Sequence, residues 1–248
     1  MKPRSAAILA VASLGLQLPA LADTARSDMA LVLAVDVSGS VDDDRFKLQR
    51  EGIAAALESD DFSAALAGGV NQTIEIAVIE WAEEQRVVLP WTVIHGHGEL
   101  TALAGRLRRA GRSWVHTMTD PGGRIAAAER LLAAQPLVAS RQVIDVSGDG
   151  RQNTGELSTA DARDAAVSHG ITLNGLPITS GDDPDVDGWY RANVIGGPGA
   201  FLVVANGYDA FAEAFRQKLT LEVTGLAPGR SLIHASVSGD FDQIKPPP

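Results

Sequence analysis

An apolar run near the start of the chain, residues 31–35, ends in side chains that could bind a metal ion. Asp36, Ser38 and Ser40 follow this run at alternate positions. Side chains alternate along an extended strand, so these three are predicted to point the same way. They emerge at the carboxyl end of a predicted strand, which is where ligands bind in open α/β sheets. One carboxylate and two hydroxyls are hard oxygen ligands, and such ligands suit Mg²⁺.

Two later segments could supply further oxygen ligands. The segment "HTMTDPGG" (116–123) precedes a predicted helix and offers Thr117, Thr119 and Asp120. The segment "DVSGDG" (145–150) ends another predicted strand, and Asp149 lies in the turn beyond it. Because one loop supplies too few ligands for octahedral coordination, we expect these segments to meet the first one at the same edge of the sheet.

Strand-like and helix-like segments alternate along the chain, a pattern typical of βαβ units. A short connection, "EEQR", separates the second and third strands, which predicts an antiparallel hairpin, and Pro90 places the third strand at a sheet edge. The predicted fold is therefore α/β and doubly wound, with a mostly parallel six-stranded sheet, one antiparallel edge strand and helices on both faces. Strands are predicted at 30–36, 73–82, 86–94, 141–147, 171–178 and 200–205, and helices at 42–58, 99–110, 123–134, 158–170, near 186–194 and at 208–221.

Residues 1–22 are predicted to form a secretory signal peptide. Lys2 and Arg4 precede an apolar stretch, and Ala20-Leu21-Ala22 gives a small-x-small cleavage pattern. The apolar stretch falls short of the roughly 20 residues that span a bilayer as a helix. We therefore expect export to the periplasm or the cell exterior after cleavage near Ala22, and no membrane insertion of the mature chain. Residues 23–28 are expected to be a linker, 29–222 one domain, and 223–248 a partly disordered tail with room for one short strand at 231–237.

Composition excludes several classes of function. The chain has 31 acidic and 21 basic residues and a net charge of −10, which argues against binding nucleic acid or anionic lipid through a basic surface. It contains no cysteine, which excludes disulfides, thiolate metal sites and thiol catalysis.

These segments resemble the von Willebrand factor type A (vWA) domain and its metal-ion-dependent adhesion site (MIDAS). More narrowly, "VDVSGSVD", "EWA", "RQVIDVSGDG" and "GITLNGLPI" are similar to a family of exported bacterial proteins of unknown function within that superfamily. The resemblance covers roughly residues 29–222 and implies a vWA/Rossmann-like sandwich. It implies five metal ligands, with Thr119 preferred to Thr117 on alignment: Asp36, Ser38, Ser40, Thr119 and Asp149.

The resemblance also raises two questions about neighbouring residues. Asp120 and Pro121 follow Thr119 at positions where the family has small apolar residues, which bears on the geometry of that loop. On an extended strand the side chains of Asp145 and Asp149 would point to the same face, so Asp145 is a candidate partner for one of the ligands.

The function implied is a non-enzymatic protein-binding module that depends on Mg²⁺, with Mn²⁺ or Ca²⁺ as alternatives. In such a module the metal recruits an Asp or Glu of a partner protein. A metal-assisted hydrolase using the same pocket, with His116 as a base, and a metal-free scaffold are the competing hypotheses. Against the hydrolase, the chain has no Gly-x-Ser-x-Gly elbow, and Ser38 replaces the second Asp of Asp-x-Asp enzymes. The oligomeric state is left open.

Other polar clusters are expected to be structural. Asp42, Asp43 and Asp44 fall in the first turn of a predicted helix, where the helix dipole favours carboxylates. The acidic loop "GDDPDVDG" (181–188) lacks the closing Glu of a calcium loop. The pair His95 and His97 lacks a third zinc ligand at suitable spacing. Glu80, in an apolar strand, is expected to pair with a buried polar group.

Overall fold

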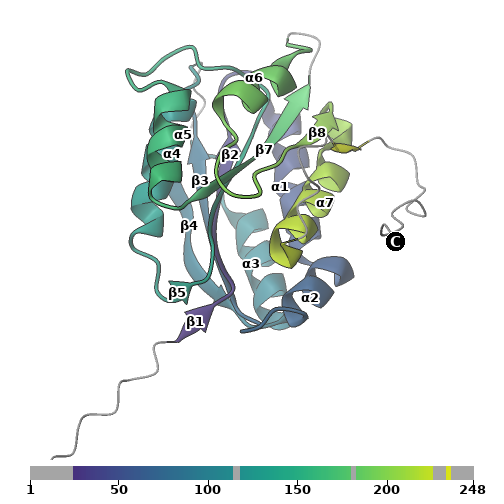
Figure 1. Ribbon diagram of the computed structural model, residues 1–248. Coiled ribbons are helices and arrows are strands. Elements are labelled where there is room, and N and C mark those ends of the chain that lie inside the picture. The colour runs from purple at the N-terminus through teal and green to yellow at the C-terminus, as the bar shows by residue number, and fades with distance from the viewer. Residues whose placement is uncertain (1–24, 114–117, 180–182, 226–232, 236–248) are drawn as a thin grey trace, which may run out of the picture.

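The structure is a computed structural model that describes residues 25–113, 118–179, 183–225 and 233–235 (Figure 1). The predicted signal peptide and most of the predicted tail lie outside these ranges, as do His116 and Thr117. No helix within the described ranges is both long enough and apolar enough to cross a membrane.

Within the described ranges, seven strands form the main sheet in the order β4-β3-β2-β6-β7-β8-β9. All neighbouring pairs are parallel except β3 and β4, which form the predicted antiparallel hairpin with β4 at the edge. The six predicted strands are present, and β9 is the short strand allowed for in the tail. The strands are β2 (Met29–Asp36), β3 (Ile74–Trp81), β4 (Gln85–Ile94), β6 (Gln142–Gly148), β7 (Thr172–Thr179), β8 (Val203–Asn206) and β9 (Ile233–Ala235).

A second, two-stranded pairing was not predicted. Strand β1 (Arg26–Ser27) pairs in parallel with β5 (Val138–Ala139) at the lower end of the molecule (Figure 1). Residues 26 and 27 were expected to belong to a linker, and this pairing joins them to the folded domain.

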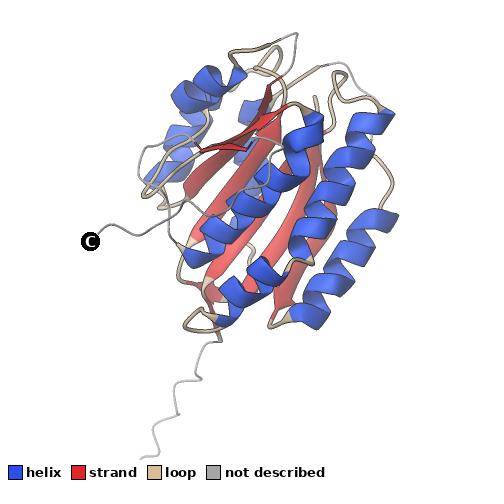
Figure 2. Ribbon diagram, turned by 90° about the vertical axis from the view of Figure 1, so that its right-hand side faces the viewer, coloured by secondary structure: helices blue, strands red, loops and turns tan. Residues whose placement is uncertain are grey.

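Helices cover both faces of the sheet (Figures 1 and 2). One layer contains α1 (Asp43–Leu57), α2 (Asp60–Ala67), α3 (His97–Arg109) and α7 (Phe211–Thr224), which follows the short turn η1 (Tyr208–Ala210). The opposite layer contains α4 (Pro121–Leu132), α5 (Thr159–Ser168) and α6 (Val186–Asn193). All predicted helices are present, and α2 is an additional one.

The central strands β2 and β3 are buried along their whole length, as expected for parallel strands covered on both faces. Along β2, the odd-numbered side chains from Met29 to Val35 pack in the α1/α3/α7 layer, and the even-numbered ones from Ala30 to Ala34 pack in the α4/α5/α6 layer. Asp36 continues the even-numbered phase. Its carboxylate therefore lies at the rim of the sheet on the side of α4 and α6.

A buried ion cluster attaches α7 to the sheet. The Nζ of Lys218 lies 2.5 Å from Asp145 Oδ1 and donates to Glu222 Oε1 at 2.5 Å. The Nδ2 of Asn174, on β7, donates to the same Glu222 oxygen at 2.9 Å. All four residues are at most 3% exposed. The expectation that Asp145 supports a metal ligand is therefore wrong, because its carboxylate faces α7 and pairs with Lys218.

This cluster predicts a pH dependence of stability. Burial, together with the charge of Glu222, raises the pKa of Asp145 from 3.8 to about 7. Between about pH 4 and pH 7 the folded protein therefore retains a proton that the unfolded chain releases, so the free energy of unfolding should fall as the pH rises through this window. Urea denaturation at pH 5 and pH 7, in chelator, should show a smaller fall for Asp145→Asn than for the wild type. Equal falls in the two proteins would contradict this assignment.

Glu80 is paired as expected. Its Oε1 accepts from Arg50 Nη2 on α1, and its Oε2 accepts from the backbone N–H of Ser113 at 2.8 Å. Glu80 is 1% exposed, so this interaction joins the end of β3 to α1 and to the segment after α3 inside the core.

Candidate metal centre

The last residue of β2 and the turn that follows it, residues 36–41, are called the metal loop, and this loop contains three of the predicted ligands. Asp36 Oδ1 accepts from the backbone N–H of Ser38 at 2.8 Å. The hydroxyl oxygens of Ser38 and Ser40 lie 3.4 Å apart. Asp36 and Ser38 are fully buried, whereas Ser40 is exposed. Strand β2 ends at Asp36, and the N–H of Val41 donates to the Ser38 carbonyl at 3.0 Å, so a turn follows the strand. This turn, and not strand alternation as predicted, brings the Ser38 and Ser40 hydroxyls together.

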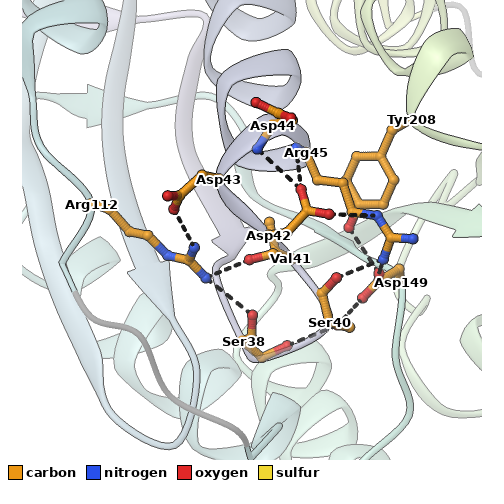
Figure 3. Close-up of polar contacts among 10 residues, drawn as sticks. All are labelled: Ser38, Ser40, Val41, Asp42, Asp43, Asp44, Arg45, Arg112, Asp149 and Tyr208. Atoms are coloured by element: carbon orange, nitrogen blue, oxygen red, sulfur yellow. Dashed lines mark hydrogen bonds and ion pairs between the residues drawn. The ribbon is translucent and has the colours of Figure 1, made fainter.

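Asp149 reaches this group from the end of β6. Its Oδ1 accepts from the Ser40 hydroxyl at 2.5 Å (Figure 3). Gly148, the last residue of β6, borders Asp36, since a Cβ at Gly148 would lie 2.5 Å from Asp36 Oδ2. The ends of two neighbouring parallel strands, β2 and β6, therefore place the two predicted carboxylates at one rim.

Thr119 lies beside the same turn. A Cβ at Gly150 would be 3.7 Å from the Thr119 hydroxyl oxygen. The backbone N–H of Thr119 donates to Asn153 Oδ1 at 2.7 Å, and the N–H of Asn153 donates back to the Thr119 carbonyl at 3.1 Å. Thr119 and Asp149 are each 5% exposed. The threonine segment is thus tied to the loop that carries Asp149.

Asp120 and Pro121, which stand where the family has small apolar residues, are compatible with the contacts of Thr119. Asp120 is the N-cap of α4, and its Oδ1 accepts from the N–H of Gly123 at 3.0 Å. Pro121 takes the first helical position, where proline's fixed φ suits the helix and its missing N–H costs nothing. Both residues therefore begin the helix that follows Thr119.

One buried carboxylate oxygen in this group could be paired with a cation. Asp36 Oδ2 is buried and has no hydrogen-bond partner among the residues that the structure describes. Burial and the charge of Asp149 raise the pKa of Asp36 from 3.8 to about 7. A buried polar atom without a partner is costly, so a cation at this oxygen would relieve the cost. The residues fit a hard divalent ion in their chemistry, because they offer two carboxylates and three hydroxyls.

The donor set is rich in hydroxyls. Within the described ranges, no three carboxylate or imidazole side chains gather into a group that could hold a metal. A metal site at this rim would therefore depend on Ser38, Ser40 and Thr119 as much as on the aspartates.

Two residues around Asp149 were missed by the sequence reasoning. The Tyr208 hydroxyl donates to Asp149 Oδ2 at 2.9 Å, and Arg45 Nη1 lies 3.6 Å from the same oxygen (Figure 3). Burial and the charge of Asp149 raise the pKa of Tyr208, so the hydroxyl keeps its proton and acts as a donor. Arg45 also lies over the Tyr208 ring, 5.1 Å from its centroid. No motif marks these residues in the sequence, since they come from α1 and η1.

The acidic run after the metal loop has the structural role expected of it. Asp42 is the N-cap of α1, and its Oδ1 accepts from the N–H groups of Asp44 at 3.0 Å and Arg45 at 2.8 Å. Asp43 and Asp44 occupy the first helical turn. These carboxylates therefore stabilise the start of α1.

The remaining polar candidates have separate partners. His95 Nδ1 lies 3.0 Å from the Thr73 hydroxyl, and His97 Nδ1 lies 3.1 Å from the Ser63 hydroxyl. In the acidic loop, Asp183 pairs with Arg151 at 2.6 Å.

Comparisons with solved structures agree with this fold. A von Willebrand factor type A protein from Catenulispora acidiphila matches with a TM-score of 0.56 and 19% identity, over 80% of this chain and 43% of the other. The vWF domain of the type V pili tip protein Mfa5 from Porphyromonas gingivalis matches with a TM-score of 0.57 and 11% identity, over 84% of this chain and 98% of the other. Proximal thread matrix protein 1 from the mussel byssus, in a structure with a zinc-occupied MIDAS motif, matches with a TM-score of 0.57 and 13% identity, over 79% of this chain and 46% of the other.

These likenesses define the class: the chain folds as a vWA-like domain. It spans less than half the length of the Catenulispora and mussel proteins. Residues 26–227 match the family model described as "Protein of unknown function (DUF1194)", and the chain belongs to that family. No curated protein sequence matches it.

Proposed function

We propose that this protein is an exported vWA module that binds a partner protein through a divalent metal ion, Mg²⁺ in the first place. The residues that would hold the ion are Asp36, Ser38, Ser40, Thr119 and Asp149. The observation that supports the proposal is the buried Oδ2 of Asp36, which has no hydrogen-bond partner within the described ranges and lies near the hydroxyls and the second carboxylate of this group.

The donor types decide what such a site can do. Ser38, Ser40 and Thr119 offer neutral oxygens, so the ligands would neutralise a divalent cation only in part. A cation held there would supply a Lewis-acidic position for an Asp or Glu carboxylate of the partner. Asp149 already accepts from Ser40 and Tyr208, and these bonds hold its carboxylate in place. The exposed Ser40 marks the side from which a partner would approach.

The charge of the chain constrains the partner. With a net charge of −10, this protein should repel a uniformly acidic surface. The partner is therefore expected to present an acidic anchor within a basic surface. A binding role is favoured over hydrolysis because the chain has no Gly-x-Ser-x-Gly elbow and because Ser38 stands where Asp-x-Asp enzymes have their second Asp.

Metal binding can be tested through stability. A ligand that binds only the folded state stabilises it by about 2.7 kcal/mol at 100 times its Kd. Thermal unfolding of the wild type should therefore shift upward with Mg²⁺ or Mn²⁺ and return with chelator. Asp36→Ala should abolish the shift. Asp44→Ala, which removes an 89% exposed carboxylate from the next helical turn, should keep it.

Partner binding needs a separate experiment. Pull-downs from the envelope of the cell that exports the protein, in Mg²⁺ and then in chelator, should recover a partner with the wild type and with Asp44→Ala in Mg²⁺ only. Asp36→Ala should recover none. If the metal raised the temperature of unfolding but no partner bound in a metal-dependent way, the protein would be a metal-binding domain, and the adhesive role would be contradicted. No metal shift at all would favour the metal-free scaffold.

A further inference from the structure

Arg112 is bound to the backbone of the metal loop. It follows α3 in the connection that leads to α4, and its side chain is 11% exposed. Its Nη2 donates to the carbonyl oxygen of Val37 at 2.9 Å. The same Nη2 donates to the carbonyl oxygens of Ser38 at 3.2 Å and Val41 at 2.6 Å (Figure 3). One guanidinium nitrogen thus connects both halves of the loop.

A second arginine completes this support. Arg45 Nη1 donates to the Ser40 carbonyl at 2.6 Å. Of the five loop carbonyls from Val37 to Val41, four therefore accept from guanidinium groups. Such bonds are charge-assisted, and the planar guanidinium fixes their directions. The backbone that carries Ser38 and Ser40 is consequently restrained from two sides.

Arg112 is itself held by the core. The neighbouring Ser113 donates its backbone N–H to Glu80 Oε2 at 2.8 Å, and Glu80 forms the buried pair with Arg50. The guanidinium of Arg112 lies 5.6 Å from the centroid of the Phe46 ring on α1, and Asp43 lies 3.5 Å from it on the exposed side. The support of the loop therefore extends to the end of β3.

We infer that Arg112 is a positioning residue that fixes the metal loop and thereby makes the site prefer Mg²⁺ and Mn²⁺ over Ca²⁺. This inference rests on the proposed metal-binding function. Mg²⁺ demands near-ideal octahedral geometry at short distances, whereas Ca²⁺ accepts longer and more flexible coordination. Loosening the loop should therefore weaken binding of the small ions more than binding of Ca²⁺.

The test compares affinities for Mn²⁺ and Ca²⁺ by calorimetric titration of four proteins. The wild type should prefer Mn²⁺. Arg112→Ala should lose at least about tenfold in Mn²⁺ affinity, since several charge-assisted bonds are removed. Its Ca²⁺ affinity should change much less, so that the Mn²⁺ preference falls. Arg112→Lys keeps the charge but lacks the planar guanidinium, so its preference for Mn²⁺ over Ca²⁺ should lie between those of the wild type and Arg112→Ala. It replaces the alanine variant in the test if that variant does not fold.

Arg108→Ala is the matched control, because Arg108 lies on neighbouring α3 and pairs with Glu51 and Glu58 at the surface. It should retain both affinities. If the wild type binds metal, the inference is overturned when both Arg112 variants keep the wild-type preference for Mn²⁺ over Ca²⁺, or when they lose affinity equally for the two ions. A wild type that bound neither ion would instead overturn the proposed function, and the inference with it.

Discussion

Replacing Lys218 by methionine should destabilise the protein by about 3–5 kcal/mol, the usual cost of removing one partner from a buried ion pair. Lys218 is fully buried between Asp145 and Glu222, at 2.5 Å from each. Without its ammonium group, two carboxylates face each other in the core. Because Lys218 and Glu222 belong to α7 and Asp145 to β6, the loss should weaken the attachment of the last helix to the sheet.

Urea denaturation at pH 7 in chelator measures this effect. Lys47→Met is the control, since Lys47 pairs with Asp44 on the surface with 73% of its side chain exposed, and exposed pairs contribute little to stability. Adding Asp145→Asn to Lys218→Met should recover part of the loss, because a neutral amide then replaces one of the two carboxyl groups left without a cation. A loss below about 1 kcal/mol for Lys218→Met would show that the cluster does not anchor α7.

The sequence was most informative where the argument was local. The short polar segment from Asp36 to Ser40 stood out in the sequence, and the structure places the Ser38 and Ser40 hydroxyls 3.4 Å apart, although a turn after β2 brings them together and not the predicted alternation. The connection between β3 and β4 was too short for a crossover, so the hairpin and the edge position of β4 could be predicted. Alternating strands and helices then sufficed for the parallel sheet, whose parallel order brings the ends of β2 and β6 to one rim.

Contacts between distant segments were not predictable in the same way. Arg112 reaches the metal loop across more than 70 residues of chain, and Tyr208 reaches Asp149 across 59. Neither residue belongs to a periodic or motif position. Asp145 was misjudged because strand alternation was extended to Asp149, which lies beyond the end of β6, where alternation no longer applies. Helix α2 was missed because only Phe62 and Leu66 of its eight residues are buried, which gives a weak apolar pattern.

Gly148→Ala should abolish the metal response of the wild type. A Cβ at this position would lie 2.5 Å from Asp36 Oδ2, 2.9 Å from Asp36 Cβ and 2.9 Å from the Tyr190 hydroxyl. Asp36 ends β2 and pairs with Trp81 across the sheet, so its backbone has little freedom to retreat. The added methyl should therefore push away the oxygen through which we propose that the metal is held. The overpacking should also cost about 1–3 kcal/mol in the metal-free protein.

Gly188→Ala provides the matched control, because a Cβ there, on α6, meets no atom of the described residues within 4 Å. It should keep the full metal-dependent shift in thermal unfolding and gain about 0.5–1 kcal/mol, since alanine is favoured over glycine inside a helix. The comparison separates the two roles of Gly148. The stability measured in chelator shows the effect of the added methyl on packing, and the further shift in thermal unfolding with Mn²⁺ shows its effect on metal binding. A Gly148→Ala protein that lost stability but kept the wild-type metal shift would mean that Asp36 Oδ2 is not a ligand, and the site would then have to be sought among Ser40, Thr119 and Asp149.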